Sequence, residues 1–218
     1  MAKAAISKLG CALLGLLQQR PSSGYDLRKI FSTTAMTTYS DSPGAIYPAL
    51  QRLQQRGFIR GSIESGSGMR RRQVFRLTAQ GTAELRKWIA RPVLRADVIR
   101  GLDEVMLRFA FSEQAVGPSA SVRILESLQA ELASYIPDLH AQLGAGKATM
   151  PTSGRLALES GIQGYECLLR WTKDALGTYA LEKIAPPRGG RPKDQEIKFG
   201  DQNLKKPRSS KTKGVEPS

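Results

Sequence analysis

The segment of residues 42–53, Ser-Pro-Gly-Ala-Ile-Tyr-Pro-Ala-Leu-Gln-Arg-Leu, constrains the fold of this chain more than any other stretch. Ser42 is a favourable N-cap residue, and Pro43 suits the first helical position because no backbone N–H is needed there. Apolar residues then recur at the spacing of one helical face: Ile46, Leu50 and Leu53. This spacing predicts a helix with one side packed on a core.

The other side of the same helix has the character of a surface that approaches a partner. Gly44 and Ala45 keep the first turn thin, and Tyr47 and Gln51 lie off the apolar face. A slim helix start that carries hydroxyl groups and no acidic residue suits the floor of a DNA major groove. An ordinary capped core helix is the second interpretation of this segment when it is read alone.

The elements expected around this helix decide between the two interpretations. Pro21 ends a first apolar helix, and Ser22 or Ser23 caps a second one. Gly57 ends the central helix, and Thr78 caps the helix that follows two strands. The expected elements are, in order, helix 4–18, helix 24–33, helix 42–56, strand 58–64, strand 70–77 and helix 79–90. This order predicts a winged helix-turn-helix with the helix of residues 42–56 as the recognition helix.

Two properties of the expected strand 70–77 shape the wing. Alternation places one set of side chains on one face, namely Gln73, Phe75 and Leu77, and a second set on the other, namely Arg72, Val74 and Arg76. At its start lie Arg70, Arg71 and Arg72, beside a glycine-rich turn. Adjacent guanidiniums repel one another in solvent but gain affinity by releasing counterions from phosphates. A solvated charged loop is the alternative interpretation.

Charge is distributed unevenly along the 218 residues. The net charge is +14 overall, with +12 in residues 1–95, −3 in residues 96–185 and +5 in residues 186–218. A basic first domain joined to a mildly acidic second one indicates a polyanionic partner for the first alone. Residues 186–218 contain few apolar side chains and have the composition of a disordered, basic tail.

Residues 96–185 are expected to form a helical domain. After a link and a short helix over residues 102–111, two longer helices carry apolar residues at three- and four-residue spacing. These are Leu125, Leu128, Leu132, Tyr135 and Leu139 in one helix, and Leu158, Ile162, Tyr165, Leu169, Thr172, Leu176 and Tyr179 in the other. Such seams predict an antiparallel helical hairpin. Further apolar residues, including Leu168, Trp171 and Leu181, then need a partner surface, which a second copy of the chain would supply.

The sequence argues against catalysis, metal binding and membrane insertion. His140 is the one histidine, and with the distant Cys11 and Cys167 it makes no usual zinc set. Both cysteines lie in apolar helical patterns, which predicts buried free thiols in a reducing compartment. Neighbouring carboxylates at 103 and 104 point different ways on a helix and suit ion pairs or capping. We therefore expect no enzyme, no cofactor, no metal, no membrane segment and a cytoplasmic location.

Several motifs in this order resemble the PadR family of bacterial transcriptional regulators. They are Leu-Leu-Gly-Leu-Leu at 13–17 with Pro-Ser-Ser-Gly-Tyr-Asp-Leu at 21–27, the segment 42–53, the wing from Gly57-Phe58-Ile59 to Phe75-Arg76-Leu77-Thr78-x-x-Gly81, and Asp103-Glu104-x-x-Leu107-Arg108 followed by Phe111. The resemblance covers roughly residues 6–180. Ala45 departs from it, because relatives often carry a hydroxyl there.

The resemblance implies a homodimer whose two winged domains bind double-stranded DNA. In that setting Tyr47 would place its hydroxyl on a phosphate or base edge, while Gln51 is the side chain best suited to read adenine. The residues expected at the DNA are Tyr25, Ser42, Pro43, Gly44, Tyr47, Gln51, Arg70, Arg71 and Arg72. Those expected at the dimer interface are Leu158, Ile162, Tyr165, Leu169, Trp171 and Leu176.

The predicted function is that of a nucleoid-associated homodimeric repressor that binds a pseudo-palindromic operator. The family often senses small aromatic or hydrophobic molecules, which makes a small-molecule effector possible. The aromatic and sulfur side chains suited to such a site are Trp88, Trp171, Tyr165 and Met106, and all four are equally explained as core. Two other functions stay open at this point: a protein-binding adaptor built on a winged helix, and an RNA-binding module.

Overall fold

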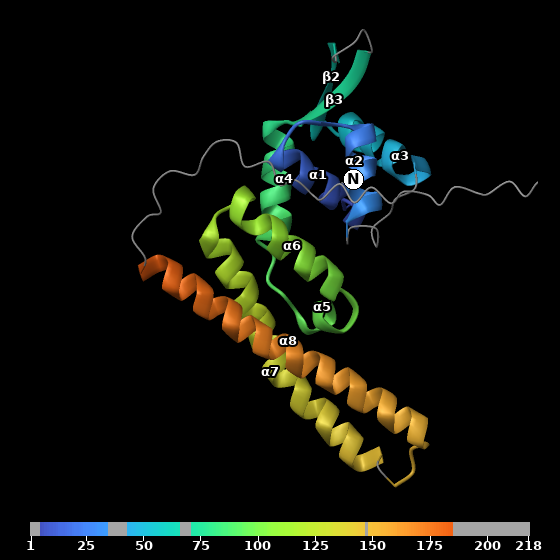
Figure 1. Ribbon diagram of the computed structural model, residues 1–218, viewed down its shortest axis with the longest axis vertical. Helices are drawn as coiled ribbons and strands as arrows, with labels where there is room; N and C mark the ends of the chain where they lie inside the picture. The colour runs from blue at the N-terminus through green and yellow to red at the C-terminus, as the bar shows by residue number, and fades with distance from the viewer. Residues whose placement is uncertain (1–4, 35–42, 66–70, 147, 185–218) are drawn as a thin grey trace, which may run out of the picture. The chain divides into compact units, whose positions relative to one another are not determined.

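The structure is a computed structural model that describes residues 5–34, 43–65, 71–146 and 148–184 (Figure 1). Its elements are α1 (Lys8–Gln19), β1 (Ser22–Ser23), α2 (Gly24–Thr33), α3 (Pro43–Gln55), β2 (Ile59–Ser65), β3 (Arg71–Leu77), α4 (Ala79–Ile89), α5 (Arg95–Arg100), α6 (Leu102–Ala115), α7 (Pro118–Gly146) and α8 (Thr152–Ile184). One compact unit ends at Ile184. The predicted basic tail lies outside the described residues. The element order confirms the mainly helical, winged helix-turn-helix fold class.

Helix α1 lies at the centre of the core. Every residue from Gly10 to Leu17 is buried, and the helix contacts α3, α4, α6 and β3. It begins at Lys8 rather than at residue 4 as predicted. The reason is the N-cap at Ser7, whose Oγ accepts a hydrogen bond from the Gly10 N–H at 3.2 Å. The apolar pattern of the sequence extends past this cap and therefore could not place the helix start.

The sheet has three antiparallel strands in the order β1-β3-β2, so β3 is central. Ser22 pairs with Phe75 in β1–β3, and Ile59 pairs with Leu77 in β2–β3. The predicted hairpin is confirmed, but β1 was missed because two serines carry no apolar alternation. Val74 and Phe75, which the alternation places on opposite faces of β3, are both buried. Since they point to opposite faces, both faces of β3 are covered at this point.

The junction from β3 to α4 leaves almost no space beside the end of α3. Gly57 has a φ of +75°, as its predicted position after the helix requires. Thr78 caps α4 by accepting from the Gly81 N–H at 3.0 Å, and its hydroxyl donates to the Gly57 carbonyl at 2.7 Å. A Cβ on Gly81 would lie 1.9 Å from the Phe58 carbonyl oxygen. The predicted roles of Gly57 and Thr78 are thereby confirmed.

Helices α5 and α6 follow α4. The sequence predicted an unstructured link over most of residues 91–102, but α5 forms there and Asp97 caps it by accepting from the Leu94 N–H at 2.9 Å. A six-residue helix carries too few apolar repeats to be recognised by periodicity. Helix α6 extends to Ala115, beyond the predicted end at 111, and the Arg86 Nε of α4 donates to the Ala115 carbonyl at 2.9 Å.

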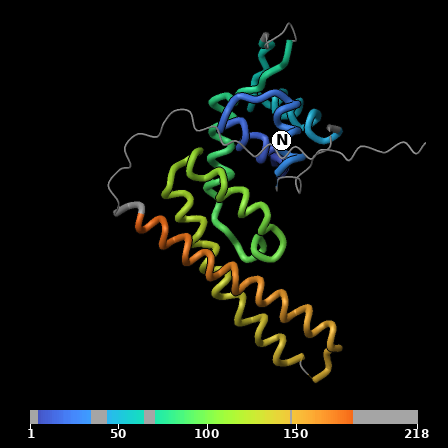
Figure 2. The backbone as a smooth tube through the Cα atoms, viewed as in Figure 1, coloured from blue at the N-terminus to red at the C-terminus, as the bar shows by residue number. Residues whose placement is uncertain are grey.

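Helices α7 and α8 form the predicted antiparallel hairpin (Figure 2). The seam residues Leu125, Leu128 and Leu132 of α7 are buried, and the Tyr135 and Tyr165 rings meet edge to face at 5.4 Å. On α8 the large apolar residues Leu156 and Leu181 remain 53% and 70% exposed. None of the described helices is both long enough and apolar enough to cross a membrane.

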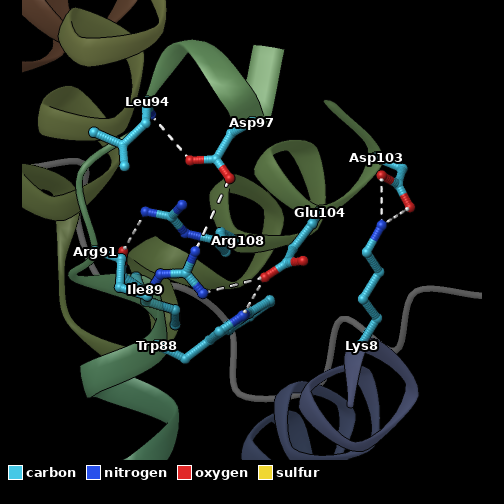
Figure 3. A network of polar contacts seen from close by, with 9 residues as sticks. All are labelled: Lys8, Trp88, Ile89, Arg91, Leu94, Asp97, Asp103, Glu104 and Arg108. Carbon is cyan, nitrogen blue, oxygen red and sulfur yellow. Dashed lines mark hydrogen bonds and ion pairs between the residues drawn. The ribbon is translucent and has the colours of Figure 1, made fainter. Parts of the chain in front are cut away.

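Polar contacts join α1 and α4 to α5 and α6 (Figure 3). The Lys8 ammonium lies 3.0 Å from the Asp103 carboxylate, and the Trp88 indole N–H donates to Glu104 at 2.9 Å. Arg91 forms ion pairs with Glu104 at 3.6 Å and with Asp97 at 3.9 Å. These contacts confirm the prediction that Asp103 and Glu104 take part in ion pairs.

Arg108 is the buried cation at the same junction. Its side chain is 1% exposed, and one guanidinium N–H donates to the Ile89 carbonyl at 3.3 Å (Figure 3). Burial lowers the pKa of Arg108, since desolvation disfavours the charged form. The contact ties α6 to the C-terminal end of α4, where a cation also interacts favourably with the helix dipole.

Gly15 allows α1 and α6 to pack together, and its replacement tests this contact. A Cβ on Gly15 would lie 2.3 Å from the Phe111 ring, whereas Gly144 on α7 has open space around it. Gly15→Ala is therefore expected to lower the free energy of unfolding by about 1–3 kcal/mol through overpacking. Gly144→Ala, the matched control, should cause no loss. Denaturant unfolding of both variants measures the difference, and equal stabilities would contradict the packing.

The two cysteines differ in burial, contrary to the prediction that both are buried. Cys11 is 2% exposed in α1, whereas Cys167 is exposed on α8. Burial is the main cause that raises the pKa of Cys11 to about 12, and the carboxylates of Glu104 and Glu84 add to it. Cys167 is not one of the predicted seam residues of α8, and apolar neighbours in sequence do not by themselves imply burial.

Alkylation should separate the two thiols. At pH 8 and in the native state, iodoacetamide is expected to modify Cys167 and to leave Cys11 intact, because the thiolate is the reactive species. Denaturation should make both residues reactive. Peptide mass spectrometry after a timed reaction provides the measurement, and comparable native rates at the two positions would contradict the burial of Cys11.

Candidate nucleic-acid interface

Helix α3 turns its two sides to different environments. Ile46, Leu50 and Leu53 are 0%, 1% and 3% exposed and face the core, where α3 contacts α1. Tyr47 is 48% exposed and Gln51 is exposed on the opposite side. The first turn holds no acidic residue, and Gly44 within it is exposed. The predicted apolar and outward sides of this helix are thus confirmed.

The start of α2 supports the Tyr47 ring. A Cβ on Gly24 would lie 2.6 Å from Tyr47 Cε1, so the ring rests directly against the glycine. Tyr25, the next residue, is 65% exposed. Both tyrosines therefore lie on the surface, although the sequence also allowed a half-buried core position for each. Their neighbouring positions bring α2 and α3 to one outer face.

A capping box fixes where α2 begins. The Asp26 carboxylate accepts from the Ser23 backbone N–H at 3.2 Å and from the Ser23 hydroxyl at 2.7 Å. Ser23 Oγ in turn accepts from the Asp26 N–H at 3.2 Å. Since Ser23 also pairs with Val74 of β3, the same short segment ties α2 to the sheet. The sequence predicted the cap but not this link.

The β2–β3 hairpin, called the wing here, projects beyond the helices that surround α1 (Figure 1). Arg71 and Arg72 begin β3 and are exposed. The Arg72 guanidinium lies 3.8 Å from the Asp26 carboxylate, which links the wing to α2. Arg76 forms an ion pair with Glu64 at 2.6 Å. The hydrogen bond that the Arg76 guanidinium donates to the Glu64 carboxylate is the main cause that lowers the pKa of Glu64.

A hollow of about 700 Å³ lies between α3 and the wing. Three glutamine amides line it together with Tyr47 and Gln51, namely Gln54, Gln55 and Gln73. Amide side chains both donate and accept hydrogen bonds, which suits them to the mixed donors and acceptors of a base edge. Sequence reasoning missed these three residues because the hollow exists only once α3 and β3 are packed together.

The remaining predicted residues are placed as follows. Ser42, Arg70 and the side chain of Pro43 lie outside the described residues. No group of three or more metal-binding side chains occurs in the described part of the chain, and His140 Nε2 lies 3.0 Å from Glu166 Oε1. Six of the predicted residues are described and exposed, and this set is called the recognition face here: Tyr25, Gly44, Tyr47, Gln51, Arg71 and Arg72.

The residues predicted to form the dimer interface are buried or half-buried within the single chain. Ile162 is buried in the α7–α8 hairpin, and Trp171 packs edge to face on Phe109 with ring centroids 5.6 Å apart. The other four are half-buried: Leu158, Tyr165, Leu169 and Leu176. Among the candidate effector residues, Trp88 lines a hollow of about 380 Å³ that Arg56, Phe58 and Arg91 also line.

Gly24→Ala tests whether the glycine positions the Tyr47 ring. The added methyl is expected to displace the ring at little cost in stability, because the end of an exposed side chain can move away. The measurement is the NMR resonances of Tyr47, assigned with Tyr47→Phe, together with the unfolding midpoint. Tyr165, which lies in the helical hairpin, serves as the internal control. Unchanged Tyr47 resonances would show that the ring does not rest on Gly24.

The transcriptional regulator PadR-like family matches residues 13–87. The chain is 30% identical over 118 residues to the negative transcriptional regulator PadR of Bacillus subtilis (strain 168), in an alignment that covers 54% of this chain and 64% of that protein. The matched region thus spans less than two thirds of the Bacillus protein. A probable transcriptional regulator of Mycobacterium tuberculosis is 23% identical over 172 residues, covering 73% of this chain and 91% of that protein.

Among solved structures, Bacillus subtilis PadR in complex with operator DNA is 23% identical and has a TM-score of 0.39. That comparison covers 78% of this chain and 98% of the other. The family match lies on the segment from α1 to α4, where the sequence motifs also lie. Over residues 13–87, the chain is therefore similar to the transcriptional regulator PadR-like family.

Proposed function

We propose that this chain is a homodimeric transcriptional repressor that binds a pseudo-palindromic operator through its recognition face. The observation that carries the proposal is the two-sided character of α3. Its apolar residues are buried against α1, while Tyr47 and Gln51 are exposed beside a first turn without acidic residues. A helix of about 10–12 Å diameter fits the major groove of B-DNA, and outward polar side chains at its start can then reach base edges.

The charge of residues 1–95 supports a DNA partner. This segment has a net charge of +12, against −3 for residues 96–185. Arg71 and Arg72 extend the positive charge onto the wing, where they can contact phosphates beside the groove. Each phosphate neutralised by a cation releases counterions, so the affinity would fall steeply as salt concentration rises.

A dimer would supply the second recognition face that a pseudo-palindrome requires. The α7–α8 hairpin leaves Leu156 and Leu181 exposed and Leu158, Leu169 and Leu176 half-buried. A second copy related by a two-fold axis would cover such a surface and would present two recognition helices to half-sites about one helical turn apart. The division at residues 95 and 96 into a DNA-binding and a dimerisation domain is part of this proposal.

Repression is the regulatory direction we propose, and the Bacillus relative named a negative transcriptional regulator supports it. A dimer bound across promoter DNA would exclude polymerase, and its place of action would be the nucleoid in the cytoplasm. Release by a small hydrophobic or aromatic effector stays a prediction from the family resemblance. Trp88, which lines a hollow between α1 and α4, is the first residue to replace when that prediction is tested.

Selection of duplexes from a random library by the full chain tests the proposal. We expect enrichment of one inverted repeat, tight binding of that repeat and a steep salt dependence in fluorescence anisotropy. Sedimentation of the free protein should give a dimer. Weak binding that ignores sequence would favour a protein adaptor, and preferential competition by structured RNA would favour an RNA-binding module.

Substitutions on α3 should separate DNA binding from dimerisation. Tyr47→Ala or Gly44→Glu is expected to reduce operator affinity to that for unrelated duplex, a loss of roughly a thousandfold or more. The dimer should survive both changes. Gly161→Glu adds the same charge at an exposed α8 position with open space and should leave operator affinity unchanged. Normal operator binding by Tyr47→Ala or Gly44→Glu would show that α3 is not the recognition helix.

A further inference from the structure

The Asp26 carboxylate takes part in two different interactions, the capping of α2 and an ion pair with the wing. Its Oδ2 atom accepts both hydrogen bonds from Ser23 that complete the capping box of α2. The same oxygen lies 3.8 Å from Arg72 Nη1 on the wing. A capping carboxylate thus also provides the ion-pair partner of a wing arginine, 46 residues later in the chain.

The pairing is selective within the wing. Arg72 lies directly opposite Glu64 in the β2–β3 register, yet the Glu64 carboxylate bonds Arg76 at 2.6 Å. Arg71, the preceding residue, points to the opposite face of β3 and forms no ion pair with any described residue. Of these two adjacent exposed arginines, Arg72 thus has the Asp26 carboxylate as its ion-pair partner, whereas Arg71 has no ion-pair partner among the described residues.

We propose that Asp26 is a positioning residue for DNA specificity, which holds the Arg72 guanidinium of the wing in register with α2 and the adjacent Tyr47. The proposal rests on the proposed function. Because the Arg72–Asp26 contact is a charge–charge contact at 3.8 Å, the five N–H donors of the guanidinium stay available for a phosphate. Phosphate contacts made from a fixed position set the register of a protein on the duplex.

The negative charge of Asp26 would also increase the preference for the operator over other duplexes. A carboxylate beside the phosphate backbone repels any duplex, whereas only the correctly docked operator gains the positioned Arg72 contact. Specificity grows when wrong complexes are penalised more than the right one. Because the pair is exposed, it adds little to folding stability, and its loss should be visible in binding rather than in unfolding.

Asp26→Asn removes the charge and keeps an oxygen that can cap α2. In the full chain we expect affinity for unrelated duplex to rise and affinity for the selected operator to fall, so that their ratio drops by about fivefold. Ser23→Ala breaks the capping box while the carboxylate remains, and serves as the control for a purely structural role. That variant should lower the unfolding midpoint with the ratio preserved.

A double-substitution cycle identifies the partner. Operator affinities of Asp26→Asn, Arg72→Gln and the double variant should be non-additive, whereas Asp26→Asn combined with Arg71→Gln should be additive. Additive effects at positions 26 and 72, or a parallel fall of both affinities in Asp26→Asn, would overturn the inference and leave the proposed function standing. A wild-type chain that selects no duplex would overturn the proposed function, and this inference with it.

Discussion

The complete burial of α1 is the constraint on which the rest of the fold depends. Its residues from Gly10 to Leu17 are covered by α3, α4, α6 and β3. A helix enclosed in this way needs small residues where neighbours approach, and Gly15 provides one beneath the Phe111 ring. Because α3 and α6 pack on the same helix, α1 sets the position of α3 and of the entry to the helical hairpin together.

The burial of the apolar side of α3 determines which of its side chains are exposed to solvent. Burial of Ile46, Leu50 and Leu53 leaves Tyr47 and Gln51 as the residues through which α3 meets its surroundings. The start of α2 then supports this face, since Gly24 lies under the Tyr47 ring and Asp26 reaches the wing. Core packing and surface chemistry are thus two results of one helix orientation.

Much of this arrangement could be predicted from local patterns. Period, caps and glycine positions located α3, the N-cap at Thr78, the positive φ at Gly57 and the α7–α8 seam, because each depends on residues close in sequence. What could not be predicted depends on packing between distant segments. The pairing of β1 with β3, the amides of Gln54 and Gln73 in one hollow and the Asp26–Arg72 contact all belong to this group.

The exposure of Cys167 and the short helix α5 show the limits of periodicity itself. A seven-residue seam identifies a buried stripe but does not say how wide it is, and six residues are too few to show a period. Both errors arise in the part of the chain beyond the match at 13–87. Strand β1, which lies inside that match, was missed for a related reason, since two residues are also too few to show a period.

The contact of Phe111 with Gly15 has a consequence for how this architecture can be recombined. The aromatic ring that fills the notch in α1 comes from α6, outside the first 95 residues. A chimera that grafts only those residues onto helices without an aromatic ring at the position of Phe111 would leave the space beside Gly15 empty. Replacement of exposed side chains on α3 leaves this contact intact, whereas exchange of the whole segment puts it at risk.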